Sequence, residues 1–390
     1  MDPAAATPRD RATPYLPAER YPFEPPFTAE EMGYRSMEFP HLSRWSHVMA
    51  DVFGSITGRG FLQQGILVML ALYVPGEGLP GHIYHTAPGQ DYYRTAFYYV
   101  YPPETSGTQE LWILHRTDLT ATTKIDYFTY TPDLRRVRRQ PQPRRSQRFP
   151  NNVQTFDDVI GRDAWEFTWR IIGTDTLRET VRFPKTRPRF TLASADGTFR
   201  DLDAADLKLM GDTYPGYTGS GGVECYVVES VPRPEWLPGY NLSKLIYWLD
   251  RRYFYPLRIE QYDQEGRLLL IEVRVAKLEN PALKDRGYAA LMTVYYDVSL
   301  DMISYSVHDG HRPTQWSAAE RHNMFRPDFM RRGWLKHVIK SRFLPRDPSE
   351  FFLRPHLHRG KFPGERAIEL APDVESRLRA QESAGRLVFD

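Results

Sequence analysis

Residues 255–279 read YPLRIEQYDQEGRLLLIEVRVAKLE, and this stretch decides the fold class. Apolar and charged residues alternate in 257–263 and again in 269–279, which is the period of β-strands with two unlike faces. The tetrapeptide DQEG at 263–266 ends in glycine, as is typical of a tight turn between antiparallel strands. The pattern predicts a β-hairpin with one buried face and one face in contact with solvent.

Further strands flank this hairpin on both sides. VECYVVES at 223–230 and KLIYWLD at 244–250 precede it, and LMTVYYDVS at 291–299 and MISYSVHD at 302–309 follow it. Aromatic-rich runs between 61 and 131 repeat the rhythm of strand and turn. Roughly nine or more strands in hairpin succession predict a mainly β protein. Such a long antiparallel meander curls or closes on itself to remove its edges.

The composition changes along the chain and predicts three parts. Residues 1–44 are rich in proline and predict an extended N-terminal arm with little core of its own. Residues 45–311 hold the strands and predict a single antiparallel domain. Residues 312–390 predict a C-terminal extension that wraps the sheet and belongs to the same globule, with helices in AAERHNMF, PDFMRRGWLKHVIK and DVESRLRAQE.

Two other helices are expected. FTAEEMGYRSM at 27–37 predicts one short helix, with Thr28 as N-cap and Glu31 three residues later. Within 150–183, the first apolar residues have helical spacing and the later ones have strand spacing, so we expect a short helix that leads into a strand.

Composition limits the classes of function. The 390 residues are 41% apolar and 14% aromatic, which is enough for a substantial core. The net charge of +2 argues against a dedicated nucleic-acid-binding protein. The longest apolar run, 65–74, is shorter than the ~20 residues that span a bilayer. Residues 1–40 contain no apolar run of signal-peptide length, so periplasm and cytoplasm both stay open.

Residues 133–152, DLRRVRRQPQPRRSQRFPNN, contain seven arginines and one aspartate. Binding to nucleic acid, attraction to an anionic membrane surface and an ordinary structural role are the three interpretations. We favour the structural one, in which RRVRRQ returns as a strand after the turn TPDL. The basic remainder then faces the acidic residues that follow it. Four arginines of the return strand are also candidates for the rim of a pocket or for contact with an anionic headgroup: Arg135, Arg136, Arg138 and Arg139.

The sequence contains no recognisable catalytic or metal-binding constellation. Cys225 is the single cysteine and lies in an apolar run, which predicts a buried strand residue. The histidine pairs lack the carboxylates that would complete a metal site, and neither HExxH nor G-x-S-x-G occurs. Carboxylates gather at Asp157, Asp158, Asp163 and Glu166. Acid–base catalysis is one interpretation of them, and ion pairing with the preceding arginines is the one we favour. We therefore predict no catalytic residue, metal or cofactor.

Aromatic residues are in excess, and a curved sheet lined with tyrosine, tryptophan, leucine and isoleucine would form an apolar pocket. Strand parity is open at this point, so the opposite face of each strand is an alternative lining. The candidates for the lining are Tyr98, Tyr127, Ile246, Trp248, Leu257 and Ile259.

Three long motifs resemble an uncharacterised bacterial family of outer-membrane lipoprotein-sorting-like proteins. They are YTPDLRRVRRQPQPRRSQRFPNNVQTFDDVIGRDAWEFTWRIIGTD, WLDRRYFYPLRIEQYDQEGRLLLIE and HRPTQWSAAERHNMFRPDFMRRGWLKH. The resemblance covers roughly residues 50–385. It implies a fold like that of the lipoprotein carriers LolA and LolB, an open and incomplete antiparallel β-barrel with a few covering helices. It also implies an apolar cavity that holds acyl chains and a location in the bacterial envelope. It supplies no catalytic residues.

Together these observations lead us to expect a non-enzymatic periplasmic protein, monomeric, that binds a lipid, a fatty-acyl chain or a lipoprotein in the hollow of its sheet. The alternative is an accessory or scaffold subunit of an envelope complex that exports lipid, with a transporter as its partner. A hydrolase that uses the carboxylates at 157–166 is a third hypothesis. Nucleic acid is not an expected partner.

Overall fold

The structure is a computed structural model of the full chain. It describes residues 26–37, 46–57, 60–74, 86–101, 104–117, 120–178, 189–193, 199–203, 217–218, 222–251, 254–278, 288–313, 316–332 and 387–388. All statements below refer to these residues. The predicted helix in DVESRLRAQE and the histidines at 82, 85, 356 and 358 lie outside them.

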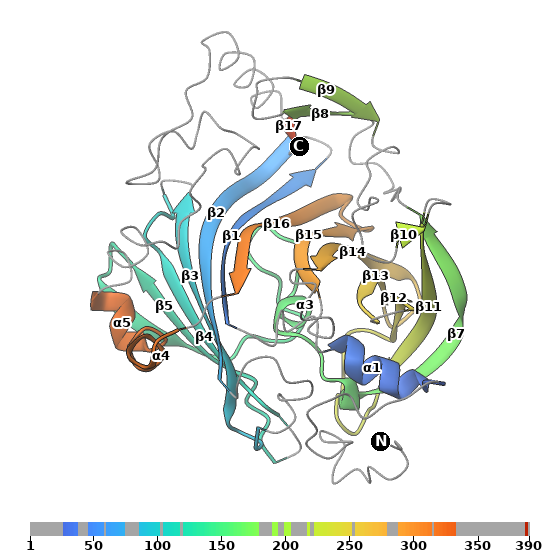
Figure 1. Ribbon diagram of the computed structural model, residues 1–390, viewed down its shortest axis with the longest axis horizontal. Coiled ribbons are helices and arrows are strands. Elements are labelled where there is room, and N and C mark those ends of the chain that lie inside the picture. The colour runs from blue at the N-terminus through green and yellow to red at the C-terminus, as the bar shows by residue number, and fades with distance from the viewer. Residues whose placement is uncertain are drawn as a thin grey trace.

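A curved antiparallel sheet of 14 described strands dominates the structure (Figure 1). The strands of its first half are β1 His47–Thr57, β2 Gly60–Tyr73, β3 Asp91–Tyr101, β4 Gln109–His115, β5 Ile125–Thr131 and β6 Arg136–Gln140. Those of its second half are β7 Phe167–Arg178, β10 Tyr217–Thr218, β11 Gly222–Pro232, β12 Lys244–Asp250, β13 Pro256–Tyr262, β14 Leu268–Leu278, β15 Tyr288–Asp297 and β16 Met302–Pro313. A small separate sheet holds β8 Arg189–Ala193, β9 Phe199–Asp203 and β17 Leu387–Val388.

The sheet consists of two meanders rather than the single one that strand succession predicts. Strands β1 to β6 run in sequence order, as do β10 to β16, and β1 joins the two by pairing with β16. The described edge strands are therefore β6 on one side and β7 on the other, and β10 pairs with the start of β11 on the same side as β12. The sheet curves without closing into a barrel, so the prediction of a mainly β, open and incomplete barrel is confirmed.

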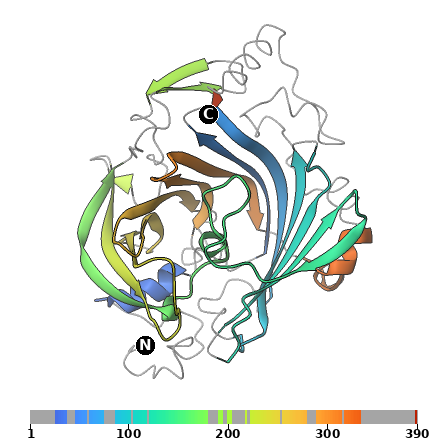
Figure 2. The same ribbon diagram turned by 180° about the vertical axis from the view of Figure 1, so that it is seen from behind.

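The described helices lie on both sides of this sheet. Helices α1 Ala29–Met37 and α3 Phe156–Ile160 lie within the curve, together with a 3₁₀ turn at Ala164–Glu166 (Figures 1 and 2). Helices α4 Ala318–Asn323 and α5 Pro327–Arg332 lie on the outer side. None of these helices has the length and apolar character that a membrane-spanning helix needs.

The expected helix near the N-terminus is confirmed, including its cap. The backbone N–H of Thr28 donates to Glu31 at 2.6 Å, and that of Glu31 donates to the Thr28 hydroxyl at 3.2 Å. Although we expected little core from residues 1–44, α1 contributes Met32, Tyr34 and Met37 to the core. The boundaries of the three predicted parts stay a prediction.

We call the side of the sheet that faces α1 and α3 the concave face, and the opposite side the outer face. Two large apolar clusters form on the concave face. One joins β1–β5 to α3, and the other joins β7 and β11–β13 to α1 and the 3₁₀ turn. The apolar surface that these strands place inside the curve is thus covered largely by the chain itself.

The hairpin at 255–279 forms as β13 and β14, with Gly266 at φ 77° in its turn. The prediction that its charged face meets solvent is wrong for β14, because Glu272 is 0% and Arg274 8% exposed. The register explains this burial. Glu272 pairs across the strands with Ile259, so both side chains lie on the concave face.

Candidate functional site

One stretch of chain, residues 145–166, crosses the concave face, and we call it the inner segment. The Ser55 hydroxyl of β1 donates to the Asn151 carbonyl at 2.6 Å. On the other half of the sheet, the Val153 N–H donates to the Ser304 hydroxyl at 3.0 Å. The segment then turns into α3, whose Phe156 ring lies 5.8 Å from that of Trp112. Through these contacts the inner segment connects the two meanders of the sheet.

A buried network of ion pairs anchors the inner segment. Arg145 donates to Asp157 at 2.8 Å and makes two hydrogen bonds to Glu166, at 2.5 and 2.7 Å. Arg162 donates to Asp158 at 2.9 Å. The carboxylates are 3–4% exposed. The favoured interpretation, in which the acidic cluster pairs with the preceding arginines, is confirmed for Arg145.

Two residues from the second half of the sheet and its connections complete this network. The Gln261 amide of β13 donates to Asp158 at 2.7 Å, and the Tyr240 hydroxyl donates to Asp157. Asp158 also forms a capping box with Thr155 at the start of α3. Burial acts to raise the pKa of Asp157, but the charges of Arg145 and Arg162 outweigh it and lower that pKa. The network therefore holds Asp157 ionised.

A second buried pair lies on β14. The Arg274 guanidinium donates to Glu272 at 2.5 Å, and the other carboxylate oxygen of Glu272 has no hydrogen-bond partner among the described residues. Burial raises the pKa of Glu272, and Arg274 offsets that effect only in part. A row of polar side chains crosses the concave face from β14 to β1: Glu272, Tyr295, Ser304 and Ser55. The inner segment forms hydrogen bonds with Tyr295, Ser304 and Ser55.

The predicted lining residues divide between the two faces of the sheet. Leu257 and Ile259 are 0% and 2% exposed and point to the concave face. Ile246 and Trp248 are half-buried on the outer face of β12. The Trp248 indole N–H donates to Asp175 at 2.9 Å, and the Arg258 guanidinium lies 5.4 Å from the ring centre.

The two predicted tyrosines are also separated. Tyr127 of β5 lies on the concave face, where its ring packs 5.9 Å from Trp112. Tyr98 of β3 pairs with Val68 and lies on the outer face. Burial, together with the nearby Tyr130 hydroxyl, raises the pKa of Tyr98 to about 12.

The four predicted rim arginines are exposed, and they do not lie on one common face of the sheet. Arg135 lies in the turn before β6, at φ 48°, rather than in the strand. Arg136 and Arg138 share a face with Tyr127, whereas Arg139 lies on the other face and pairs with Asp126. None of the four lines either cavity described below.

A small cavity of about 130 Å³ lies between the inner segment and the start of β5. Its walls include Lys124, Arg145, Asp157, Trp165 and Trp236. Its cations are already paired with carboxylates, since Lys124 lies 3.1 Å from Asp163 and Arg145 lies 2.8 Å from Asp157. This volume is below the roughly 300–1,000 Å³ of typical ligand pockets.

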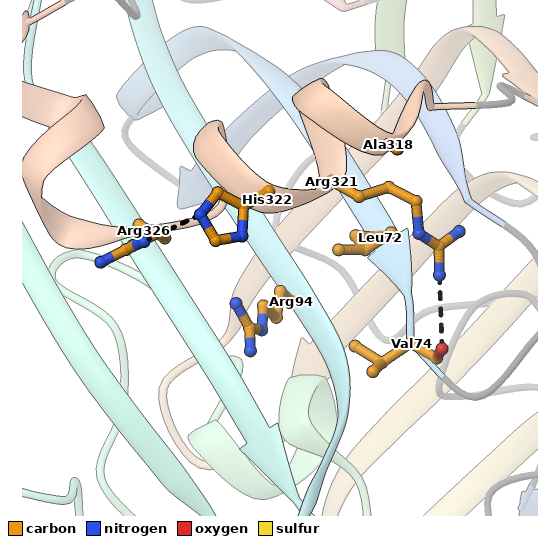
Figure 3. A pocket seen from close by; sticks show the side chains of 7 residues that line it. All are labelled: Leu72, Val74, Arg94, Ala318, Arg321, His322 and Arg326. Atoms are coloured by element: carbon orange, nitrogen blue, oxygen red, sulfur yellow. Dashed lines mark hydrogen bonds between the residues drawn. The ribbon is translucent and has the colours of Figure 1, made fainter.

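A larger groove of about 560 Å³ lies on the outer face, between α4 and strands β2 and β3. Figure 3 shows the side chains that line it: Leu72, Val74, Arg94, Ala318, Arg321, His322 and Arg326. No local pattern in the sequence predicts this groove. Its residues come from distant segments, and only the helical pattern of AAERHNMF indicated that α4 exists.

The filling of the concave face by the inner segment was likewise not predicted from the sequence. Two signals were available, the capping residues Thr155 and Asp158 and the apolar residues Phe149, Val153 and Phe156, which a plain surface loop would not need. Within the described ranges, no group of three or more His, Cys, Asp or Glu side chains is arranged to hold a metal ion.

Several solved structures are similar to this chain. The domain of a protein ascribed to outer membrane lipoprotein sorting, from Vibrio parahaemolyticus, is 14% identical, with a TM-score of 0.51 over 78% of this chain and 98% of its own. A DUF1329 family protein from Desulfovibrio piger is 15% identical, with a TM-score of 0.50 over 76% of this chain and 95% of its own. A LolA superfamily protein from Nitrosomonas europaea is 10% identical, with a TM-score of 0.43 over 75% of this chain and 97% of its own.

No curated protein matches the chain at a significant level. A family model described as "Protein of unknown function (DUF1329)" matches residues 70–331. This range runs from the end of β2 to α5, and it includes the inner segment and most residues of both cavities. The family resemblance expected from the three sequence motifs is thereby confirmed. The chain belongs to the DUF1329 family.

Proposed function

We propose that this chain is a non-enzymatic protein of the bacterial periplasm that binds a lipid, a fatty-acyl chain or a lipoprotein and carries it. The observation that supports the proposal is the curved, unclosed sheet with apolar clusters on its concave face. The same fold occurs in the domain ascribed to outer membrane lipoprotein sorting. Leu257, Ile259 and Tyr127 remain our proposed contacts on the concave face, and Arg136 and Arg138 remain proposed contacts for an anionic headgroup.

The hydrophobic effect would drive such binding. Each methylene of an acyl chain that leaves water contributes about 0.8 kcal/mol. A chain of about 16 carbons could therefore contribute on the order of 10 kcal/mol before the costs of ordering and immobilisation are subtracted. Apolar surface of this kind needs few polar contacts to bind an acyl chain.

The buried carboxylates favour binding over chemical turnover. A general base is most effective when its pKa lies near the working pH. The pKa of Asp157 is instead lowered, away from neutral pH. Its carboxylate accepts hydrogen bonds from Arg145 and Tyr240. These groups stabilise the inner segment, and we propose no catalytic role for them.

The proposal can be tested with delipidated protein. Purified protein that has been unfolded, extracted and refolded would be titrated with a fluorophore-labelled palmitic acid, and freshly purified protein would be examined by native mass spectrometry. We expect saturable uptake and a co-purifying lipid mass. Failure of both measurements would refute lipid carriage.

A second candidate function is an accessory subunit of an envelope complex that exports lipid. The observation that favours it is the inner segment, which fills the concave face and leaves a cavity of about 130 Å³ beside β5. In that case, photocrosslinking in cells from the exposed residue Leu300 should yield one discrete adduct with a transporter subunit. Lipid uptake without such an adduct would argue for carriage instead.

A further inference from the structure

The outer groove between α4 and the β2–β3 strands has the size of a ligand site. Its volume of about 560 Å³ falls within the roughly 300–1,000 Å³ of small-molecule pockets. Its floor is apolar, since Leu72 is 3% exposed and Val74 follows at the end of β2. On the helix side, Ala318 is exposed and has the smallest side chain of the lining.

Hydrogen bonds fix the helix above this floor. The Trp316 indole, just before α4, donates to the Ala71 carbonyl of β2 at 2.8 Å. Arg321 of α4 donates to the Val74 carbonyl at 3.4 Å, as Figure 3 shows. On the far side, Arg94 of β3 donates to the Phe325 carbonyl at 3.3 Å. The groove is therefore formed before any ligand arrives, which lowers the entropic cost of binding.

Positive charge is concentrated on the lining. Arg94, Arg321 and Arg326 are the charged residues among the seven that line the groove, and His322 lies beside Arg326 at 3.4 Å. Arg94 is paired with Asp91 at 2.6 Å. In the described part of the chain, neither Arg321 nor Arg326 has a carboxylate partner.

Part of this charge has an ordinary structural explanation. Arg321 and His322 lie in the last turn of α4, where cations are favourable next to the exposed carbonyls. Arg326 lies beyond the end of α4, so the exposed helix carbonyls do not account for its position at the groove. An apolar floor beside Arg321 and Arg326, which have no carboxylate partner among the described residues, is complementary to an amphiphile with an acidic headgroup.

We propose that this outer groove binds a single-chain fatty acid, with the chain along Leu72, Val74 and Ala318 and the carboxylate at Arg321 and Arg326. The inference rests on the proposed function in one respect, the acyl nature of the ligand. It differs by placing the ligand on the outer face rather than in the concave hollow, and by requiring a negative headgroup.

The test compares two probes and two pairs of matched variants. The probes are fluorophore-labelled palmitic acid and the uncharged palmityl alcohol with the same label. Ala318→Trp fills the groove, and Ala319→Trp places the same side chain on a neighbouring exposed residue that does not line it. Arg326→Gln removes one proposed headgroup contact, and Arg331→Gln removes an exposed arginine of α5 outside the groove.

We expect Ala318→Trp to weaken the binding of both probes by at least about tenfold, because bulk at this site displaces the chain. Arg326→Gln should weaken the binding of palmitic acid by about tenfold or more and leave the binding of the alcohol unchanged, as loss of one charge-assisted hydrogen bond predicts. Ala319→Trp and Arg331→Gln should bind both probes as the wild type does.

The outcomes separate this inference from the function on which it rests. If Ala318→Trp binds palmitic acid as well as the wild type does, the outer groove is not the binding site. Lipid carriage would then stand, with the concave face as its site. Absence of any binding by the wild type would overturn both. If Arg326→Gln weakens the binding of the acid and of the alcohol equally, the assignment of the carboxylate to Arg326 is wrong. Binding to phosphatidylglycerol vesicles without binding of free palmitic acid would also overturn the proposal, in favour of a membrane surface.

Discussion

Replacing Arg145 with methionine tests whether the buried ion pairs hold the inner segment in place. The change removes one hydrogen bond to Asp157 and two to Glu166, and it leaves both carboxylates buried. Removal of one partner from a buried pair costs about 3–5 kcal/mol. Arg145 is 27% exposed and Glu166 keeps Lys124 at 3.6 Å, so some of that loss is compensated. We expect a loss of about 3 kcal/mol.

Urea unfolding followed by circular dichroism measures this loss. With a slope of about 3 kcal/mol per molar urea, the midpoint should fall by about 1 M. Arg144→Met changes an exposed arginine next to it and should stay within about 0.5 kcal/mol of the wild type.

The pH dependence of this loss provides a second criterion. In the wild type, the lowered pKa of Asp157 stabilises the fold at neutral pH, and this stability is lost as the pH falls through the folded pKa. Without Arg145, burial should dominate and raise the pKa of Asp157. Protonation of Asp157 at lower pH then removes the cost of burying its charge. The difference between the variant and the wild type should therefore shrink toward about pH 4.5. Equal losses in Arg144→Met and Arg145→Met, or a loss independent of pH, would refute the reasoning.

Three further predictions concern the packing of the sheet. Gly33→Ala would place a Cβ atom 2.5 Å from the Trp169 ring, so α1 should loosen from β7 at a cost of about 1–3 kcal/mol, detectable as a red shift of tryptophan emission. The pKa of Glu272 is raised, so its ionisation should lower stability as the pH rises from about 4.5 through the folded pKa. Glu272→Gln should abolish that slope in urea titrations at several pH values, and an unchanged slope would contradict the assignment. Cys225 is 0% exposed and burial raises its pKa to about 12, so a thiol reagent should modify it only after unfolding. Rapid modification of the folded protein would contradict this burial.

Local patterns predicted most of the sheet. Alternation and turn residues found β13 and β14, and the apolar run around Cys225 found β11, because period-two patterns are local properties of a strand. The capping pair Thr28 and Glu31 likewise marks the start of α1 without any tertiary information. These features depend on neighbours within a few residues of each other.

The face of each strand and the filling of the hollow could not be predicted in this way. Ile246 and Ile259 look alike in sequence, yet the register of β12 and β13 places them on opposite faces. Glu272 looks like a solvent-facing residue until the fold buries it on the concave face beside Arg274. The outer groove depends on α4 meeting β2, which are far apart in the chain. Each of these facts is a long-range pairing that no local pattern contains.

The pairing of β1 with β16 has a consequence for how the protein folds. His47 pairs with Pro313, so the centre of the sheet is closed by strands from nearly opposite ends of the described chain. Sheets dominated by such distant contacts fold slowly. At a synthesis rate of about 5–20 residues per second, β1 would wait on the order of 10–50 s for β16. During that time the first meander presents an unpaired strand, the kind of edge at which aggregation starts. A chain with this topology avoids exposing that edge if the sheet forms only after β16 has been synthesised.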